Sequence, residues 1–320
     1  MRKIGIATTG GDAPGMNAAI RAVVRIAVSR HLEVVGFHRG YDGLMNDDPE
    51  PLTPRSVGGI LQLGGTILHT ARCPEFATPR GVRKAARNLS RNRIDGLVVI
   101  GGNGSFNGAC DLSRETDALI TGIPATIDND VYGTEETIGF DTAVNTAVSE
   151  IDKIRDTAIS HERTFIVEVM GRNKGFLALT AGITSGAEII IVPEIRLKKE
   201  NMFRTLEENS RKGKKSSIIV KAEGAGDADE LAKAIEKRTG SEVRISVLGY
   251  AQRGGSPTAR SRLLASLFGE KAVELLISGQ RNKVVGLQNG RVSMIDLEKS
   301  CKTEKPLDMN LMLLANMLAT

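Results

Sequence analysis

The feature that most constrains the fold of this chain is a regular alternation of two kinds of segment. Short β-branched runs such as Lys3–Thr8 and Gly96–Ile100 are separated by longer segments in which apolar residues recur every three or four positions. In Thr142–Ile159, Val144 and Val148 lie on one face of the expected helix. This alternation predicts an α/β fold, with parallel sheets that carry helices on both faces.

The same pattern locates the individual elements. The expected strands are Lys3–Thr8, Glu33–His38, Gly96–Ile100, Leu119–Ile123, Thr164–Met170, Glu188–Val192, Ser217–Ala222, Val243–Leu248 and Lys283–Leu287. The expected helices are Met16–Ser29, Gly81–Asn92, Thr142–Ile159, Glu200–Lys212, Asp227–Arg238 and Arg260–Ile277. A further helix is expected after the glycines that follow the strand at Gly96–Ile100. A chain of 320 residues is too long for one simple core, which suggests two α/β lobes or one large domain.

Composition narrows the class of ligand. The net charge is +5, a mild excess that suits small anionic molecules. Tryptophan is absent, aromatic residues make up only 3% of the chain, and no long basic run is present. These features argue against a nucleic-acid-binding protein, because such proteins need basic tracks and stacking surfaces.

The cysteines and the chain's apolar segments indicate the compartment. Cys73, Cys110 and Cys301 are widely spaced, odd in number and without a CxxC pair. This pattern argues against a disulfide framework or a zinc site and fits a reducing cytoplasm. The first residues enter a strand directly, unlike a signal peptide, and no apolar run approaches membrane-spanning length. We therefore expect a cytoplasmic protein that does not bind membranes.

In sheets of this kind, ligands bind where strands end and helices begin, so the loops after the strands are the informative places. The loop "TTGGDAPGMNAA" follows the first strand. Gly10 and Gly11 allow close approach of a ligand to the main chain, and Pro14 stands where a helix would begin. Free N–H groups at a helix start make an anion site. The alternative is a plain glycine turn in which Asp12 caps the helix.

A second glycine turn, "IGGNGSFNGA", follows a later strand. The spacing of Gly102, Gly104 and Gly108 superficially resembles a dinucleotide-binding turn. The next strand, however, ends at Pro124 without the acidic residue that would bind a ribose, and no lysine is present to make a P-loop. Two separate glycine turns suit a chain of phosphates better than either turn alone.

The loop "GIPATIDNDVYGT" carries carboxylates at the end of a strand. Asp128 and Asp130 follow Thr126 in an irregular segment. Carboxylates at this place can orient a metal ion or accept a hydroxyl proton during group transfer. The structural alternative is a set of side-chain turns in which these groups bond neighbouring amides. We favour the functional interpretation.

Several cations and one carboxylate lie at other strand ends. Arg163, Arg172, Arg244 and Arg253 stand beside glycines or strand termini, where guanidinium groups would clamp a phosphate. Taken singly, each would be a solvated surface arginine. Glu223 closes the strand "SIIVKA" and could accept hydrogen bonds from sugar hydroxyls, or could cap the next helix.

A second basic group lies away from these loops. Arg21 and Arg25 share one helical face, and Lys212, Lys214 and Lys215 cluster in "RKGKKS". By default these are solvated faces. Their separation from the strand-end carboxylates leaves open a second anion site.

Taken together, "TTGGDAPGMNA", "IGGNGS", "PATIDND", "VEVMGR" and "GYAQRGGSP" resemble the bacterial-type ATP-dependent 6-phosphofructokinase family. The resemblance runs from Ile4 to the C-terminal region. It implies a phosphofructokinase fold of two Rossmann-like lobes with mostly parallel sheets, assembled as a homotetramer. It also implies a glycolytic kinase that uses ATP and Mg²⁺ to phosphorylate the 1-hydroxyl of fructose 6-phosphate. The larger lobe, residues 1–140 and 252–301, would bind ATP, and the smaller lobe, 141–251 and 302–320, the sugar phosphate.

The resemblance also implies roles for individual residues. Asp128 would be the general base, Thr126 would steady the transferring phosphoryl group, and Arg172 would stabilise its charge. The ATP-binding positions would be Gly11, Arg72, Cys73, Gly102, Asn103, Gly104 and Ser105. The sugar-phosphate contacts would be Thr126, Ile127, Asp128, Met170, Gly171, Arg172, Glu223, Tyr250 and Arg253, with Arg163 and Arg244 reaching in from a neighbouring subunit. An ADP or phosphoenolpyruvate effector would bind Arg21, Arg25, Arg155, Gly186, Glu188, Lys212, Lys214 and Lys215.

Three positions depart from the family pattern. Asn103 replaces the aspartate that usually holds Mg²⁺ through water, which predicts weaker Mg²⁺ binding unless Asp128 or Asp130 compensates. Tyr250 replaces a histidine that contacts the sugar phosphate. Pro54 replaces an effector-site arginine, with Arg55 adjacent.

Two small residues bear on the phosphoryl donor. Pyrophosphate-dependent members tend to carry an aspartate at the position of Gly104 and a lysine at that of Ala125, so this chain is predicted to use ATP. A pyrophosphate-dependent enzyme is the alternative. A catalytically weak regulatory subunit is a second alternative, which Asn103 alone supports. A nicotinamide-dependent dehydrogenase is disfavoured for want of the ribose-binding acid.

Overall fold

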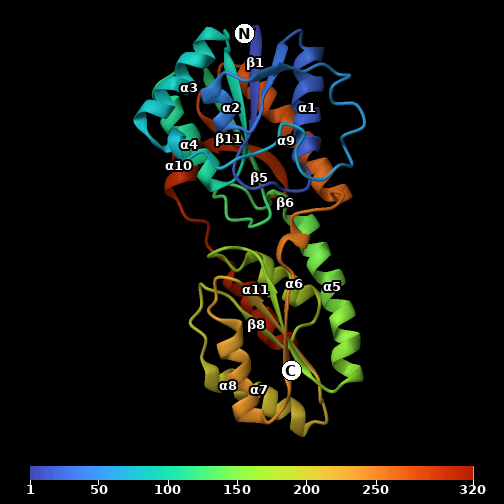
Figure 1. Cartoon of the computed structure of the whole chain (residues 1–320). Helices are drawn as coiled ribbons and strands as arrows, with labels where there is room; N and C mark the ends of the chain where they lie inside the picture. The colour runs from blue at the N-terminus through green and yellow to red at the C-terminus, as the bar shows by residue number, and fades with distance from the viewer. Residues whose placement is uncertain (320) are drawn as a thin grey trace. The chain divides into compact units, whose positions relative to one another are not determined.

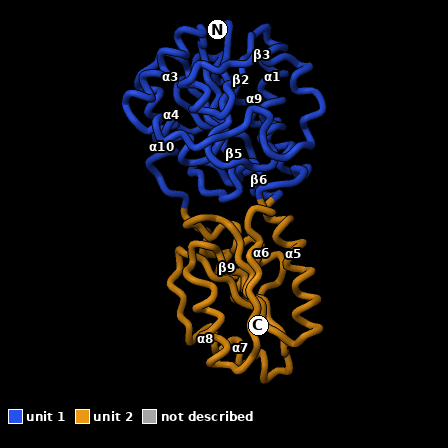
Figure 2. The backbone as a smooth tube through the Cα atoms, viewed as in Figure 1, with its two compact units in different colours: residues 1–142, 253–305 blue, residues 143–252, 306–320 orange. Residues whose placement is uncertain are grey.

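The computed structural model describes residues 1–319, which fold into two compact α/β units (Figure 2). Unit 1 comprises residues 1–142 and 253–305. Unit 2 comprises residues 143–252 and the C-terminal segment from Pro306. The assignment of ATP to one lobe and of the sugar phosphate to the other stays a prediction.

Unit 1 is built on an eight-stranded sheet in the order β12-β11-β5-β4-β1-β2-β3, with β6 paired to β5. The pairs β11–β12 and β2–β3 at the two edges are antiparallel, and the other pairs are parallel. The strands are β1 (Lys3–Thr8), β2 (Glu33–Phe37), β3 (Pro49–Pro51), β4 (Gly96–Gly101), β5 (Leu119–Thr126), β6 (Ile138–Gly139), β11 (Lys283–Gln288) and β12 (Arg291–Asp296). Every residue of β4 is buried, as expected of a central parallel strand.

Helices cover both faces of this sheet, with α1 and α9 on one side and α3, α4 and α10 on the other (Figure 1). The helices are α1 (Met16–Ser29), α2 (Tyr41–Asn46), α3 (Pro79–Arg91), α4 (Asn103–Ser113), α9 (Ala259–Ile277) and α10 (Leu297–Lys302), with the 3₁₀ turn η1 (Pro74–Ala77). The helix α5 (Phe140–Ser160) begins in unit 1 and continues into unit 2.

Unit 2 has a four-stranded, wholly parallel sheet in the order β10-β7-β9-β8. Its strands are β7 (Thr164–Val169), β8 (Ile189–Ile191), β9 (Ser217–Ala222) and β10 (Val243–Val247). Its remaining elements are α6 (Phe176–Thr184), α7 (Lys199–Arg211), α8 (Ala228–Thr239), α11 (Met309–Leu318) and the 3₁₀ turn η2 (Gly249–Gln252). Apolar side chains of α7 and α8 pack on one face around Ile166 and Ile219.

The α/β class and the predominantly parallel sheets were correctly predicted, but three strands were not. The clearest omission is β12, which pairs with β11 through the two-residue turn Asn289-Gly290. Both turn residues have positive φ, 50° and 70°, which is the conformation that an Asn-Gly hairpin turn requires. The sequence therefore carried this signal. The other two, β3 and β6, contain only three and two residues, too few for a periodic pattern to show.

Candidate functional site

The two glycine turns of unit 1 lie at the switch point of its sheet. The chain leaves β1 towards β2 on one side and leaves β4 towards β5 on the other, so the carboxyl ends of β1 and β4 flank a crevice. Hydrogen bonds join the two turns. The N–H of Thr9 donates to the Ile100 carbonyl at 3.0 Å, and the Ser105 hydroxyl donates to the Thr9 carbonyl at 3.0 Å.

The helices that start from these turns have no side chain to cap them. Gly15 precedes α1 and Gly102 precedes α4, and neither helix has an acidic residue in its first turn. By contrast, the Thr258 side chain accepts a hydrogen bond at the start of α9. Uncapped N–H groups and the positive end of a helix dipole attract an anion. This corner of unit 1 is therefore suited to phosphate groups.

Asn103, which lies between Gly102 and Gly104 of the second glycine turn, is the first residue of α4. Its side-chain Nδ2 donates to the main-chain carbonyl of Asp130 at 3.1 Å. An aspartate could not make this bond, because a carboxylate only accepts hydrogen bonds. The amide thus links the glycine turn to the carboxylate loop. This link is the structural consequence of having Asn103 where the family usually has an aspartate.

The carboxylate loop follows β5 and is held by Asn129. This residue has a φ of 52°, and its side chain accepts from the Thr137 N–H at 3.0 Å and donates to the Glu135 carbonyl at 3.1 Å. Asp128 is only 4% exposed, and its main-chain N–H donates to the Thr126 hydroxyl at 3.2 Å. Asn129 therefore has the structural role that the sequence offered as an alternative, because its side chain bonds neighbouring main-chain groups.

Arg253 lies in unit 1 beside the first glycine turn. Its Nη1 is 3.1 Å from the point where a Cβ on Gly11 would stand, and 4.0 Å from a carboxylate oxygen of Asp12. Of the other predicted ATP-binding residues, Arg72 is exposed, and Cys73 is half-buried at the start of η1.

In unit 2, the loop Met170–Arg172 follows β7, and Glu223 follows the neighbouring strand β9. A Glu223 carboxylate oxygen accepts from the main-chain N–H of Gly171 at 3.2 Å and of Arg172 at 2.6 Å. Arg172 has a φ of 52°, a conformation that these bonds help to hold. Glu223 does not cap the next helix, because the side chain that caps α8 is that of Asp227.

The predicted inter-subunit arginines lie at the opposite end of these strands. Arg163 Nε is 2.6 Å from a carboxylate oxygen of Glu242, and Arg244 pairs with the same carboxylate. Tyr250, in η2, is 79% exposed.

Comparison with known proteins identifies the family. A family model described as phosphofructokinase matches residues 3–276. The chain belongs to the phosphofructokinase family. It is 52% identical over 311 residues to a protein of Lysinibacillus sphaericus named ATP-dependent 6-phosphofructokinase, covering 97% of each chain. A protein of the same name from Halothermothrix orenii is 49% identical over the whole of both chains.

A solved structure supports the same fold. The T-state phosphofructokinase of Pichia pastoris superposes on 99% of this chain with a TM-score of 0.89 and 34% sequence identity. This chain spans 36% of the length of that much longer protein. The predicted phosphofructokinase fold is confirmed.

Four of the predicted effector residues of this phosphofructokinase gather in unit 2. The Glu188 side chain is only 3% exposed, and it pairs with Lys214 and with Arg155, whose Nη1 lies at 3.4 Å. Arg155 also donates to the Gly186 carbonyl at 2.8 Å. Of the remaining predicted residues, Lys212 at the end of α7 lines the same pocket as Glu188, whereas Lys215 pairs with Glu162. Arg21 and Arg25 are on α1 of unit 1.

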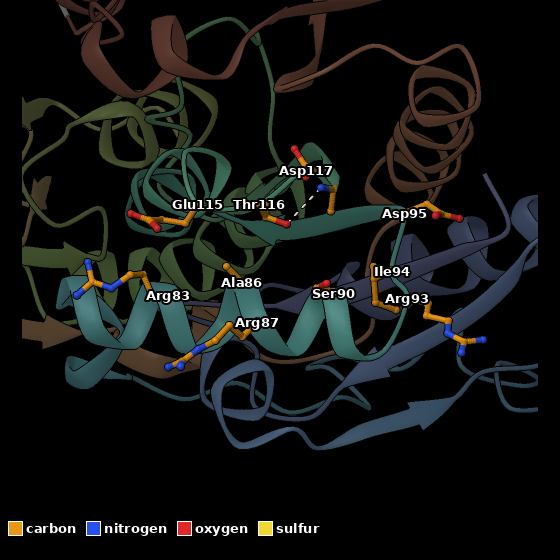
Figure 3. A pocket seen from close by; sticks show the side chains of 11 residues that line it. Arg83, Ala86, Arg87, Ser90, Arg93, Ile94, Asp95, Glu115, Thr116 and Asp117 are labelled. Atoms are coloured by element: carbon orange, nitrogen blue, oxygen red, sulfur yellow. Dashed lines mark hydrogen bonds between the residues drawn. The ribbon is translucent and has the colours of Figure 1, made fainter.

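A cavity of about 570 Å³ lies elsewhere in unit 1, between α3 and the segment that enters β5 (Figure 3). Asp95 and Asp117 place it at the amino ends of β4 and β5, the edge opposite to the glycine turns. Arg83, Arg87 and Arg93 are among the residues that line it. None of the predicted site residues lines it.

The sequence did not predict the aromatic residues that hold the second glycine turn in place. The buried Tyr41 hydroxyl donates to the Ser105 carbonyl, and its ring stacks on Phe76 with centroids 3.9 Å apart. Burial raises the pKa of Tyr41 well above its usual value, so the hydroxyl keeps its proton. Gly108 leaves room for both rings, because a Cβ there would stand 2.8 Å from Tyr41. No local pattern marks a contact across 64 residues.

Two findings bear on metals and membranes. Within residues 1–319, no group of three or more His, Cys, Asp or Glu side chains is placed to hold a metal ion. No helix in the same residues is long and apolar enough to cross a membrane.

Proposed function

We propose that this phosphofructokinase transfers the γ-phosphoryl group of ATP to the 1-hydroxyl of fructose 6-phosphate, as a glycolytic enzyme of the cytoplasm. The products are ADP and fructose 1,6-bisphosphate. The full-length relatives named ATP-dependent 6-phosphofructokinase support this reaction. The observation that carries it is the pair of linked, uncapped glycine turns at the switch point of unit 1. Such turns bind a chain of phosphates through main-chain N–H groups.

Asp128 is the proposed general base. A carboxylate accepts the proton as the sugar hydroxyl attacks phosphorus, and the burial of Asp128 shields this group from bulk water. Thr126, whose hydroxyl bonds the Asp128 N–H, steadies the transferring phosphoryl group. Arg172 supplies positive charge as negative charge develops on the phosphoryl oxygens.

Two small side chains support ATP over pyrophosphate as the donor. A Cβ added at Gly104 would meet nothing within 4 Å, so the space beside the second glycine turn is open. Ala125 is 1% exposed within β5, and it supplies no cation to neutralise a free pyrophosphate tail. The open space beside Gly104 leaves room for the adenosine diphosphate portion of ATP.

The residues of unit 1 fit a magnesium ion that is held mainly by the nucleotide. Mg²⁺ in such sites is bound by phosphates, waters and one or two protein oxygens, so a dedicated cluster of carboxylates is not required. Asp128, Asp130 and the amide oxygen of Asn103 are the oxygens that would hold it. When bound, the ion neutralises charge on the phosphate oxygens.

We also propose how the protein is regulated and assembled, from the positions of its predicted effector and inter-subunit residues. Arg155, Glu188 and Lys214 form a compact charged cluster suited to a phosphate-bearing effector such as ADP or phosphoenolpyruvate. Arg163 and Arg244 would reach the sugar phosphate of a neighbouring subunit in a homotetramer. Activity would then fall on dilution to monomers.

Steady-state assays test the reaction. The purified protein, supplied with fructose 6-phosphate and equal Mg²⁺, should turn over with ATP and show at most a few per cent of that rate with pyrophosphate. The Asp128→Asn variant should lose about 10³-fold in kcat, the loss expected for a general base, with the KM for fructose 6-phosphate changed only a few-fold.

Asp130→Asn is the matched control, because it removes a carboxylate two residues away. It should lose much less in kcat and mainly raise the Mg²⁺ concentration that gives half-maximal rate. Equal turnover of Asp128→Asn and wild type would contradict the role of Asp128. Faster turnover with pyrophosphate would contradict the choice of donor.

A further inference from the structure

Two cysteines that are 191 residues apart in the sequence meet in unit 1. Cys110 lies in α4 and Cys301 in α10, and their Sγ atoms are 3.1 Å apart. Both are free thiols in this structure. A disulfide bond is about 2.0 Å long, so the sulfurs need to approach by only about 1 Å to bond.

The surroundings of the pair favour oxidation. Cys110 is buried at 7% exposure, whereas Cys301 is partly exposed and gives small molecules access to the pair. The hydrogen bond from the Cys301 thiol lowers the pKa of Cys110, and the nearby Arg114 guanidinium acts in the same direction. Burial of the thiol and the charges of Glu298 and Asp111 oppose this lowering of the pKa. A thiolate is the reactive form of cysteine, so the contact between the thiols favours the reactive form of Cys110, while it raises the pKa of Cys301.

We propose that Cys110 and Cys301 are a redox modification site that forms a reversible disulfide with a peroxide as oxidant. One thiolate attacks a peroxide oxygen, the O–O bond breaks, and hydroxide leaves to give a sulfenic acid. The second thiol attacks the sulfenic sulfur, the S–S bond forms, and the sulfenic oxygen leaves as water. The pair thus loses two electrons and two protons while one hydrogen peroxide becomes two waters. A dithiol reductant reverses the change.

The position of Cys110 connects this site to the second glycine turn. Cys110 lies seven residues after Asn103, so the two side chains share one face of α4 two turns apart. The Ser105 carbonyl is held by Tyr41 near the start of the same helix. Drawing Cys110 towards α10 therefore shifts a helix whose first turn faces the phosphate crevice. If the turn binds ATP, as the proposed function has it, the oxidised protein binds ATP more weakly than the reduced protein.

Peptide mapping tests the disulfide on the full-length protein. After reduction and brief treatment with hydrogen peroxide, a non-reducing digest should contain one cross-linked peptide joining residues 110 and 301, with a mass loss of about 2 Da. Dithiothreitol should remove it. The cross-link should also raise the melting temperature by roughly 5 °C, because it closes a very long loop.

Cys110→Ser and Cys301→Ser are the matched controls, and each should abolish both the cross-linked peptide and the peroxide-induced rise in melting temperature. The wild-type protein before and after dithiothreitol is an internal control for folding. Oxidation to sulfinic acid at either cysteine without the cross-link would overturn the proposal. So would a disulfide that joins either residue to Cys73.

Kinetics test the connection to the glycine turn. Peroxide-treated wild type should show at least a twofold higher KM for ATP, restored by dithiothreitol, and Cys301→Ser treated in the same way should not change. A cross-linked protein with an unchanged KM would overturn the connection. A protein that cross-links as expected but has no ATP-dependent activity would contradict the proposed function and leave the redox site intact, so the two failures are distinguishable.

Discussion

The two units present their predicted ligand loops by different physical means. In unit 1, glycine turns lead into helices whose main-chain N–H groups are capped by no side chain. In unit 2, charged side chains position the predicted ligand-binding groups. Glu223 holds the loop that carries Arg172, and the nearly buried Glu188 holds Arg155 and Lys214.

Because of this difference, we expect the two units to be sensitive to different kinds of substitution. The main-chain N–H groups of unit 1 carry no titratable charge. Their positions depend on how closely neighbouring segments of the main chain pack against one another. Unit 1 should therefore be sensitive to added volume. An ion pair depends on both partners, and a buried charge that loses its partner is strongly destabilising. Unit 2 should therefore be sensitive to the loss of a single charge.

The largest expected effect comes from Lys221 in unit 2. This lysine is fully buried on β9, and its Nζ lies 2.8 Å from a carboxylate oxygen of Glu168 on β7. Lys221→Met should lower the free energy of unfolding by about 3–5 kcal/mol, because the Glu168 carboxylate then lacks its cation. Urea denaturation measures the change. The double variant Lys221→Met/Glu168→Leu should recover most of the loss, and equal instability of both variants would contradict an ion-pair cause.

A smaller effect should follow removal of the Glu223 carboxylate. Glu223→Ala frees the main chain at Gly171 and Arg172, so the KM for fructose 6-phosphate should rise about 10- to 100-fold through misplacement of the loop. Asp227→Ala, which removes only the cap of α8, is the control. It should cost about 1 kcal/mol of stability with the KM unchanged. An equal KM for both variants would show that Glu223 has no positioning role.

The third effect tests unit 1 by adding one methyl group. A Cβ at Gly101 would stand 2.3 Å from the Ser105 hydroxyl and 2.6 Å from the Thr9 carbonyl, whereas one at Gly104 would meet nothing within 4 Å. Gly101→Ala should therefore lower stability by about 1–3 kcal/mol, and Gly104→Ala should leave it unchanged or slightly raised. Thermal unfolding of the pair measures the contrast. Equal melting temperatures would contradict the claim that close packing limits this turn.

The smallest effect concerns Lys305, a partly buried cation of unit 1 that donates to the Glu135 carbonyl at 3.1 Å. Burial lowers the pKa of Lys305 from 10.5 to about 8. Between these values the unfolded chain binds more protons than the folded protein, so stability should rise with pH across this window. Lys305→Met should flatten that rise, measured as melting temperature from pH 7.5 to 10. An unchanged pH profile would show that Lys305 titrates normally.

Local patterns predicted most of the elements that carry the site, but not their contacts. The strands and the glycine turns were predictable because periodicity and main-chain freedom are properties of neighbouring residues. The bond from Asn103 to Asp130 was not, because it depends on where two loops meet. The same holds for Glu223, for which local reasoning left a choice between a sugar contact and a helix cap.

Short-range patterns and motifs in a fixed order were enough to predict the α/β class, the family and the loops that bear glycines and carboxylates. Which side chains meet became known only from the fold. The spacing of the cysteines argued against a disulfide framework, yet packing of α10 on α4 brings two of them into contact. The physical reason is that long-range contacts are set by the packing of whole elements, which no local stretch of residues encodes.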